Sequence, residues 1–180
     1  MIAAGSLLIA PPKILDPRFR ESVILICEHT AQGTLGVCLN RPLPIKISSL
    51  GLELEPWLED RELYWGGPVN THVVSVLHPR QWQMRTTVSV TDTVSMTSHH
   101  RQFHRLAEDP PQGFQAFTGF TQWAPGQLEM ELKGQEPWTP HSSWLTLAVP
   151  PAFEPWEHAP EDLWRWAVAA SSQQAVSAWL

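Results

Sequence analysis

Three adjacent side chains near the start of the chain carry the groups that thiol chemistry needs. Cys27 supplies a thiol, Glu28 a carboxylate and His29 an imidazole, and a base that deprotonates a cysteine makes it a nucleophile. In a strand, the Cα atoms of Cys27 and His29 would lie about 7 Å apart on one face, while Glu28 would point to the other. A direct contact between thiol and imidazole would need a bent strand end. We therefore expect Cys27 to be a small buried side chain, with catalysis by Cys27 and His29 as the alternative.

The second cysteine extends this alternative to redox chemistry. Residues 22–42 predict a hairpin, because two apolar stretches flank a turn signal at Gln32-Gly33. With these two residues at the centre of the turn, Cys27 lies directly opposite Cys38, and a shift of one residue would separate them. A reversible disulfide would make the protein a thiol-based redox sensor in which Cys38 resolves the oxidised Cys27.

A predicted helix before Pro110 carries a candidate set of metal ligands. His100, His104 and Glu108 recur every four residues and so share one face, a spacing that resembles half of a zinc site. The arginines beside them indicate a solvent-exposed helix surface, and the three side chains would still need ligands from elsewhere. We therefore expect no metal and no other cofactor.

Two turn motifs are better candidates for binding. Asn40-Arg41-Pro42 follows the hairpin, and an arginine can grip a carboxylate or a phosphate. Gly66-Gly67-Pro68 follows a predicted strand, and paired glycines can present backbone N–H groups to an anion. Both motifs would also fit plain tight turns. Their spacing differs from that of nucleotide-binding fingerprints, so nucleotide binding is not predicted.

A third candidate region joins a strand end to a helix start within residues 119–131. Trp123 lies between the two elements, and Pro125-Gly126-Gln127 opens the helix. A helix N-terminus beside an aromatic side chain can receive an anion or the backbone of a partner. Packing of Trp123 over the hairpin is the alternative interpretation.

Hydrophobic periodicity places these motifs in a chain of short strands and a few helices. In addition to the hairpin, strands are expected near residues 5–10, 62–65, 73–78, 87–96, 115–121 and 143–149. Helices are expected before Pro110, over residues 126–133 and from Pro160 onward. Ser171-Ser172 is a candidate interruption of the last helix, whose apolar stripe would consist of Leu163, Trp166, Ala167 and Ala170.

Short motifs along most of the chain resemble the YqgE/AlgH family. They include, in order, Asp16-Pro17-x-Phe19, Cys27-Glu28-His29, Asn40-Arg41-Pro42, Gly66-Gly67-Pro68-Val69, Leu77-His78 and Gly126-Gln127-Leu128-Glu129. The resemblance implies a single α+β domain over residues 1–150, with a mixed, largely antiparallel sheet curled into a pseudo-barrel and helices outside it. Residues 151–180 would be a Trp-rich, helical C-terminal extension packed on that domain. Family members are often labelled transcriptional regulators.

Composition limits the classes of function. The net charge of −6 and the 12 scattered Lys and Arg residues argue against a broad nucleic-acid surface. Because no helix-turn-helix pattern is evident either, direct DNA binding is not expected. No apolar run approaches the roughly 18 residues of a membrane span, and two cysteines in 180 residues fit a reducing cytoplasm, which the family resemblance implies is that of a bacterium.

We predict a non-catalytic binding or regulatory protein that acts through a protein partner or a small ligand. Its candidate surface combines Asn40, Arg41, Gly66, Gly67, Pro68, Trp123 and Gln127. The alternative is an enzyme or redox sensor that uses Cys27, Cys38 and His29, and it requires an accessible Cys27 thiol with a lowered pKa. A third interpretation has the Trp-rich C-terminus docking onto another protein.

Overall fold

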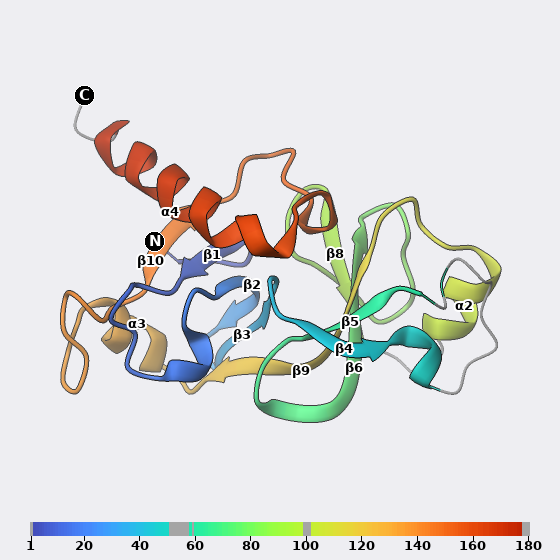
Figure 1. The fold of residues 1–180 in the computed structure, drawn as a ribbon, viewed down its shortest axis with the longest axis horizontal. Helices are drawn as coiled ribbons and strands as arrows, with labels where there is room; N and C mark the ends of the chain where they lie inside the picture. The colour runs from blue at the N-terminus through green and yellow to red at the C-terminus, as the bar shows by residue number, and fades with distance from the viewer. Residues whose placement is uncertain (1, 51–57, 59, 99–101, 178–180) are drawn as a thin grey trace.

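The computed structural model describes residues 2–50, 58, 60–98 and 102–177 of the chain, which Figure 1 shows as a ribbon. The strands are β1 (Ser6–Ile9), β2 (Val23–Thr30), β3 (Gly33–Cys38), β4 (Pro42–Lys46), β5 (Glu62–Trp65), β6 (Val69–Pro79), β7 (Thr87–Ser89), β8 (Val94–Thr97), β9 (Gln115–Trp123) and β10 (Leu145–Ala148). The α-helices are α2 (Gln102–Glu108), α3 (Gln127–Leu132) and α4 (Pro160–Ser177), and single 3₁₀ turns are η1 (Pro17–Phe19), η2 (Ile47–Leu50) and η3 (Pro155–Glu157).

One mixed sheet contains all of these strands. Its neighbours follow the order β10-β1-β2-β3-β9-β6-β8-β7, and β4 and β5 lie beside this path. The pairs along the path are antiparallel, whereas β5 runs parallel to β9. Strand β9 joins the two halves, because residues 116–118 pair with both β5 and β6 while 121–123 pair with β3. The predicted α+β class and the curled, largely antiparallel sheet are confirmed (Figure 1).

The first two strands are buried on both faces, as their unbroken apolar runs indicate. Alternate residues on one face form an apolar cluster with α4, which includes Leu7, Ile9, Val23, Leu25, Leu163 and Ala167. The residues between them form a second cluster on the other face with α3 and two tryptophans, which includes Leu8, Ile24, Ile26, Trp123, Leu128 and Trp144. The second cluster forms the base of the candidate site.

The predicted register of the β2–β3 hairpin is wrong. Ala31 and Gln32 form the turn, because Gly33 already belongs to β3 and pairs with Thr30. The pairing also shifts at Cys27, which forms a β-bulge, so that Cys38 lies opposite Ile24. As a result the two thiols belong to clusters on opposite faces of the sheet, Cys27 with α4 and Cys38 with the tryptophans. Both cysteines are free and buried.

Helix α4 lies against β10, β1 and β2, and its C-terminal end points away from the strands (Figure 1). The indole Nε1 of Trp164 attaches it to the sheet by donating to the Ala10 carbonyl oxygen at 2.9 Å. The candidate interruption at Ser171-Ser172 is absent, since α4 continues through both residues, and their hydroxyls donate to the Val168 carbonyl oxygen within the helix. Within the described ranges, no helix is long and apolar enough to cross a membrane.

The opposite end of the sheet contains a fully buried histidine, His78 in β6. Its Nδ1 lies 2.9 Å from the Pro79 carbonyl oxygen, so this nitrogen carries the proton and donates. Its Nε2 then accepts from the Thr97 hydroxyl at 2.8 Å, and Thr97 lies 2.8 Å from the hydroxyl of Thr87. Burial lowers the pKa of His78, because the charged imidazolium would lose its contact with water.

Candidate functional site

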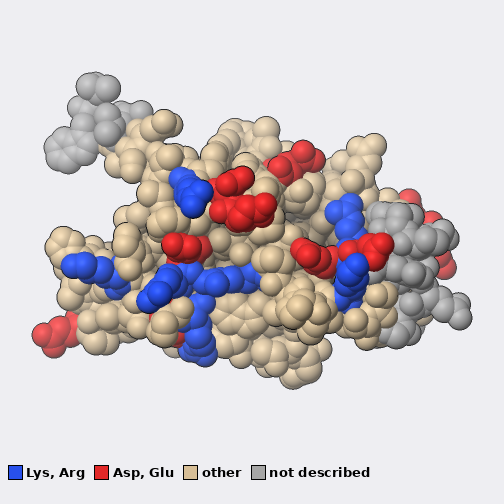
Figure 2. All heavy atoms as spheres, in the orientation of Figure 1, with Lys and Arg blue, Asp and Glu red and all other residues tan. Residues whose placement is uncertain are grey.

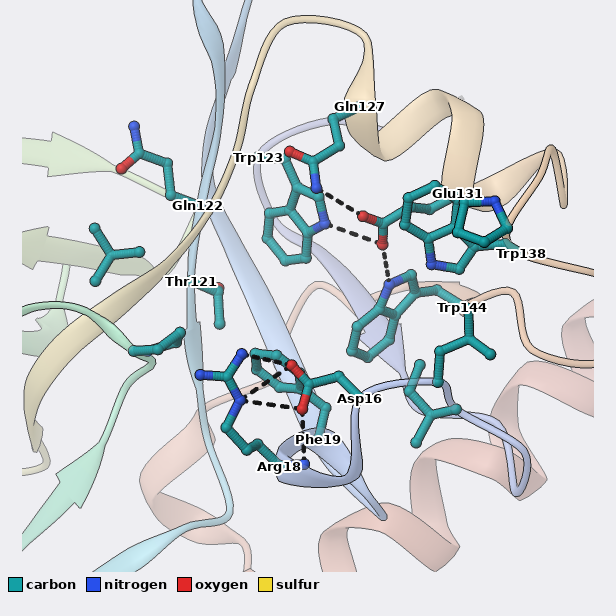
Figure 3. A pocket seen from close by; sticks show the side chains of 15 residues that line it. Asp16, Arg18, Phe19, Thr121, Gln122, Trp123, Gln127, Glu131, Trp138 and Trp144 are labelled. Carbon is teal, nitrogen blue, oxygen red and sulfur yellow. Dashed lines mark hydrogen bonds and ion pairs between the residues drawn. The ribbon is translucent and has the colours of Figure 1, made fainter.

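A pocket of about 460 Å³ lies beside the end of β9. Figure 3 shows how the side chains around it converge from η1 and the loop before it, the end of β9, α3 and the loop that leads to Trp144. The fold thus brings residues 14–19 beside residues 121–144. We call it the Glu131 pocket, and it is lined by Ile14, Leu15, Asp16, Arg18, Phe19, Pro68, Val69, Thr121, Gln122, Trp123, Gln127, Glu131, Pro137, Trp138 and Trp144.

A buried carboxylate, that of Glu131, is the central polar group of the pocket. Glu131 is only 6% exposed, and its Oε2 accepts from the indole Nε1 of Trp144 at 2.8 Å and of Trp123 at 3.2 Å. Its Oε1 accepts from the Nε2 of Gln127, one helical turn earlier, at 3.0 Å. The Oε1 of Gln127 in turn accepts from the backbone N–H of Ala124 at 3.0 Å and so fixes the start of α3. Three neutral donors therefore hold this carboxylate (Figure 3).

Aromatic rings form the walls next to Glu131. The rings of Trp123 and Trp144 meet at 82° with their centroids 6.3 Å apart. Those of Phe19 and Trp144 meet at 71° with their centroids 5.8 Å apart. Successive rings are thus nearly perpendicular, an edge-to-face arrangement that aromatic pairs favour. The half-buried Trp138 adds a fourth aromatic side chain to the lining.

An ion pair borders the pocket at η1. The Asp16 carboxylate caps this turn by accepting from the backbone N–H of Arg18 at 3.0 Å, as expected for an aspartate followed by proline. The guanidinium of Arg18 then donates to both carboxylate oxygens, through Nε at 3.0 and 3.1 Å and through Nη2 at 2.6 Å. Hydrogen bonding to Arg18 lowers the pKa of Asp16. Each of these two charges is therefore already paired with the other.

The pocket also contains one polar group that lacks a partner. The Thr121 side chain is 2% exposed, and its hydroxyl makes no hydrogen bond to the described residues. A buried hydroxyl without a partner costs free energy, which a ligand atom that hydrogen-bonds to it could recover. Thr121 is thus a candidate contact for the polar part of a ligand.

Three of the predicted site residues meet at this pocket. Trp123, Gln127 and Pro68 all line it, and Trp123 does so while 5% exposed. Its indole N–H is committed to Glu131 rather than to an incoming group. Gly126 adopts a left-handed conformation at the start of α3, and the helix is only six residues long. Such a short helix does not by itself form an anion site at its N-terminus. Glu131 and the aromatic rings are therefore the groups of this region that can select a ligand.

Asn40 and Arg41 lie outside this pocket and make structural contacts instead. Asn40 Oδ1 accepts from the Val23 N–H at 2.9 Å, and its Nδ2 donates to the Glu21 carbonyl oxygen at 2.8 Å. The Arg41 guanidinium donates to the Ser22 hydroxyl at 3.4 Å and to the carbonyl oxygen of Arg20. Together these side chains hold the segment that leads into β2, and a role for them in ligand binding stays a prediction.

Gly66 and Gly67 are buried where the backbone crosses β9. A Cβ atom on Gly66 would lie 2.2 Å from the Gly119 carbonyl oxygen, and one on Gly67 would lie 2.1 Å from the carbonyl carbon of Phe120. The Gly66 N–H already donates to the Thr118 carbonyl oxygen at 2.9 Å. The glycine pair therefore permits a close approach of two chain segments, and the Gly66 N–H is already bonded within the fold.

The thiol alternative lacks both properties that it requires. Cys27 is fully buried, and burial raises its pKa to about 12, the reverse of what a reactive thiolate needs. Burial also raises the pKa of Cys38. His29 does not contact the thiol: its Nδ1 lies 2.7 Å from the Thr34 hydroxyl and its Nε2 lies 3.4 Å from a Glu129 carboxylate oxygen.

The candidate metal ligands are only partly within the described residues. His104 and Glu108 are exposed on α2, and His100 lies outside the described residues. Among the residues that are described, no group of three or more His, Cys, Asp or Glu side chains could hold a metal ion.

Several residues of the pocket were absent from the predicted site. Glu131, Phe19 and Trp144 entered the sequence argument only as parts of longer motifs or ranges. The spacing of Gln127 and Glu131 by one helical turn is a local signal of a polar pair on one helix face. Trp144 carries no comparable signal, because its contact with Glu131 depends on how the loop before β10 folds back.

Comparison with known proteins places this chain among bacterial relatives. The family model described as AlgH-like (DUF179) matches residues 7–175. A UPF0301 protein from Thiobacillus denitrificans is 36% identical over 149 residues, which cover 80% of this chain and 77% of the relative. A UPF0301 protein from Idiomarina loihiensis is 35% identical over 167 residues, which cover 87% of this chain and 89% of the relative.

Two solved structures are similar in fold. The solution structure of the AlgH protein from Pseudomonas aeruginosa has a TM-score of 0.77 and 27% identity, and the match covers 93% of this chain and 87% of that chain. An X-ray structure of a protein from Corynebacterium diphtheriae has a TM-score of 0.65 and 26% identity, and the match covers 84% of this chain and 78% of that chain. The names of these four relatives state no substrate and no reaction.

Proposed function

This chain belongs to the AlgH-like family, and from that premise we propose that it is a non-catalytic binding protein whose ligand site is the Glu131 pocket. One observation carries the proposal: a carboxylate that is 6% exposed is held by neutral donors at the wall of an aromatic pocket. Binding pockets for small molecules are mostly apolar and aromatic, with a few convergent polar groups. The volume of about 460 Å³ suits a small ligand.

A binding role fits the pocket better than catalysis does. A general base or nucleophile needs a group free to take a proton or to attack. Both oxygens of Glu131 accept hydrogen bonds from the protein, and the Asp16 carboxylate is held by Arg18. Among the described residues that line the pocket there is no Cys, His or Lys.

A regulatory role would then act through the bound ligand or through a protein partner rather than through direct contact with DNA. On the face shown in Figure 2, Lys and Arg side chains gather in small groups that Asp and Glu side chains interrupt. Neutralisation of phosphates needs a continuous basic surface. The cytoplasmic location inferred from the cysteine content remains part of this proposal.

The test uses the indole N–H resonances of the ¹⁵N-labelled protein, titrated with a fractionated small-molecule extract of bacterial cells. Ligand binding should shift the signals of Trp123 and Trp144, while Trp164, whose N–H donates to Ala10 under α4, serves as an internal control. Trp138→Ala should weaken the response, because this half-buried side chain lines the pocket. If no fraction shifts the indole N–H signals of Trp123 and Trp144, the proposed function is overturned.

A further inference from the structure

We propose that the Glu131 pocket binds a small molecule through an aliphatic ammonium group, and this inference rests on the function proposed above. Three properties of the lining point to this ligand: a negative charge outside any ion pair of the described residues, aromatic rings at nearly right angles and a buried hydroxyl without a hydrogen-bond partner among those residues. Figure 3 shows them around one space.

The charge of the lining favours a cation. The lining contains two carboxylates, from Asp16 and Glu131, and one guanidinium, from Arg18. Asp16 and Arg18 form an ion pair at 2.6 Å and offset each other's charge. Glu131 belongs to no ion pair among the described residues, and its donors are two indoles and one amide. One negative charge therefore remains at the buried end of the pocket, where low polarity strengthens its attraction for a cation.

The aromatic walls favour the same group. A cation gains most when it lies over the faces of Trp, Tyr or Phe rings within about 6 Å of their centroids, and cages of perpendicular rings recognise ammonium groups in this way. Phe19, Trp144 and Trp123 provide successive walls at 71° and 82°. Alkyl substituents on the ammonium would pack on these rings while the positive charge faces the Glu131 carboxylate. A strongly hydrated metal ion would make poorer use of such walls.

The remaining lining accounts for the rest of such a molecule. The Thr121 hydroxyl, which is buried and without a partner among the described residues, can hydrogen-bond to a hydroxyl or ester oxygen of the ligand. Leu15 at the rim is 51% exposed and offers apolar surface to an alkyl chain. An anion is disfavoured, because the Arg18 guanidinium is already held by Asp16 and the Glu131 charge would repel it.

The experiment compares three molecules of nearly one shape. Choline carries a quaternary ammonium, dimethylbutanol is its neutral carbon isostere, and dimethylbutyrate is a related anion. Each is titrated into the labelled protein while the indole signals of Trp123 and Trp144 are followed, with Trp164 as the internal control. We expect choline to bind at least about tenfold more tightly than dimethylbutanol, and dimethylbutyrate to bind more weakly still.

Variants assign the preference to the groups named. Glu131→Gln should remove most of the tenfold preference for choline over dimethylbutanol, whereas Glu129→Gln on the same helix should keep it. If Glu131→Gln does not fold, Phe19→Leu gives an independent test, because it removes a ring face and keeps an apolar wall. It should weaken the binding of choline more than that of dimethylbutanol.

The possible outcomes separate this inference from the proposed function. If dimethylbutanol or dimethylbutyrate shifts the Trp123 and Trp144 signals and binds as tightly as choline or more tightly, the ammonium inference is overturned. The proposed function as a binding protein would then still stand. A choline preference that survives in both Glu131→Gln and Phe19→Leu would also overturn it. If none of the three molecules moves these signals but a component of the cell extract does, the pocket binds a ligand of another class. If nothing moves them, both proposals fail.

Discussion

Replacement of Glu131 by alanine should lower the free energy of unfolding by about 2–6 kcal/mol. The change removes the common acceptor of three N–H groups, those of Trp123, Trp144 and Gln127. The two tryptophans are 5% and 6% exposed, so their indole N–H groups would lose their partner away from water. Each buried donor left unpaired costs about 1–3 kcal/mol, which gives the stated range for the two. The half-buried Gln127 amide can turn to water and adds little.

Glutamine at position 131 should recover most of this loss. Its amide oxygen can still accept from both indoles, but its NH₂ would then face the NH₂ of Gln127, so one hydrogen bond of about 1 kcal/mol is lost. Glu129→Ala is a matched control on the same helix. The Glu129 side chain is 41% exposed and its described ion pair is with His29, so its loss should stay within about 0.5 kcal/mol.

Denaturant unfolding followed by circular dichroism measures all three variants, with indole spectra to confirm that the native fold is kept. The order of destabilisation should be Glu131→Ala, then Glu131→Gln, then Glu129→Ala. If the alanine and glutamine variants lose the same stability, or if the alanine variant loses less than about 1 kcal/mol, Glu131 is not the acceptor that joins α3 to both tryptophans.

Two further predictions concern titratable groups in the core. Neither Cys27 nor Cys38 should react with a thiol reagent in the folded protein, because burial hides both and raises the pKa of each, that of Cys27 to about 12. The reagent should count two thiols after denaturation, and rapid labelling of native protein would restore the redox alternative. The free energy of unfolding should fall as the pH drops below the unfolded-state pKa of His78, near 6.5, because burial lowers the folded-state pKa and the unfolded chain therefore binds the extra proton. Denaturation at several pH values should show that the free energy of unfolding rises with pH, and His78→Gln should reduce this slope by at most about 1.4 kcal/mol per pH unit. If His78→Gln leaves the slope unchanged, His78 is not buried in its neutral state.

The sequence predicted strands best where apolar runs are unbroken, as in residues 23–27, because such runs need burial on both faces. It could not predict the hairpin register, which depends on a strand far along the chain. Gly33 pairs within the hairpin, yet a Cβ atom there would lie 2.5 Å from the Trp123 carbonyl oxygen. Gly33 therefore lies against β9, whereas local turn rules place it in the turn. As a result the turn lies one residue earlier than predicted, and Cys27 is no longer opposite Cys38.

The candidate site could likewise be predicted only where its contacts are local in the sequence. Trp123 and Gln127 lie on one strand-to-helix connection, so their proximity is local and could be derived. Asn40 and Arg41 have polar side chains suited to ligands, but their donors and acceptors bind the backbone before β2. Sequence gives the chemistry of such a side chain but not the partner that the fold supplies. Trp144 reaches Glu131 only through tertiary folding.

The pairing of β1 with β10 has a consequence for synthesis of the chain. Ser6 lies opposite Ala148, so one edge of the first strand has no partner until β10 has left the ribosome, about 140 residues after β1. An unpaired strand edge can join other chains, and this one stays open while the β2–β3 hairpin can already close. Trp144, just before β10, completes the Glu131 pocket at the same stage. A nascent chain that stops before Trp144 therefore has an open strand edge and an incomplete Glu131 pocket, and the folding of β10 onto β1 closes the edge at the stage when Trp144 completes the pocket.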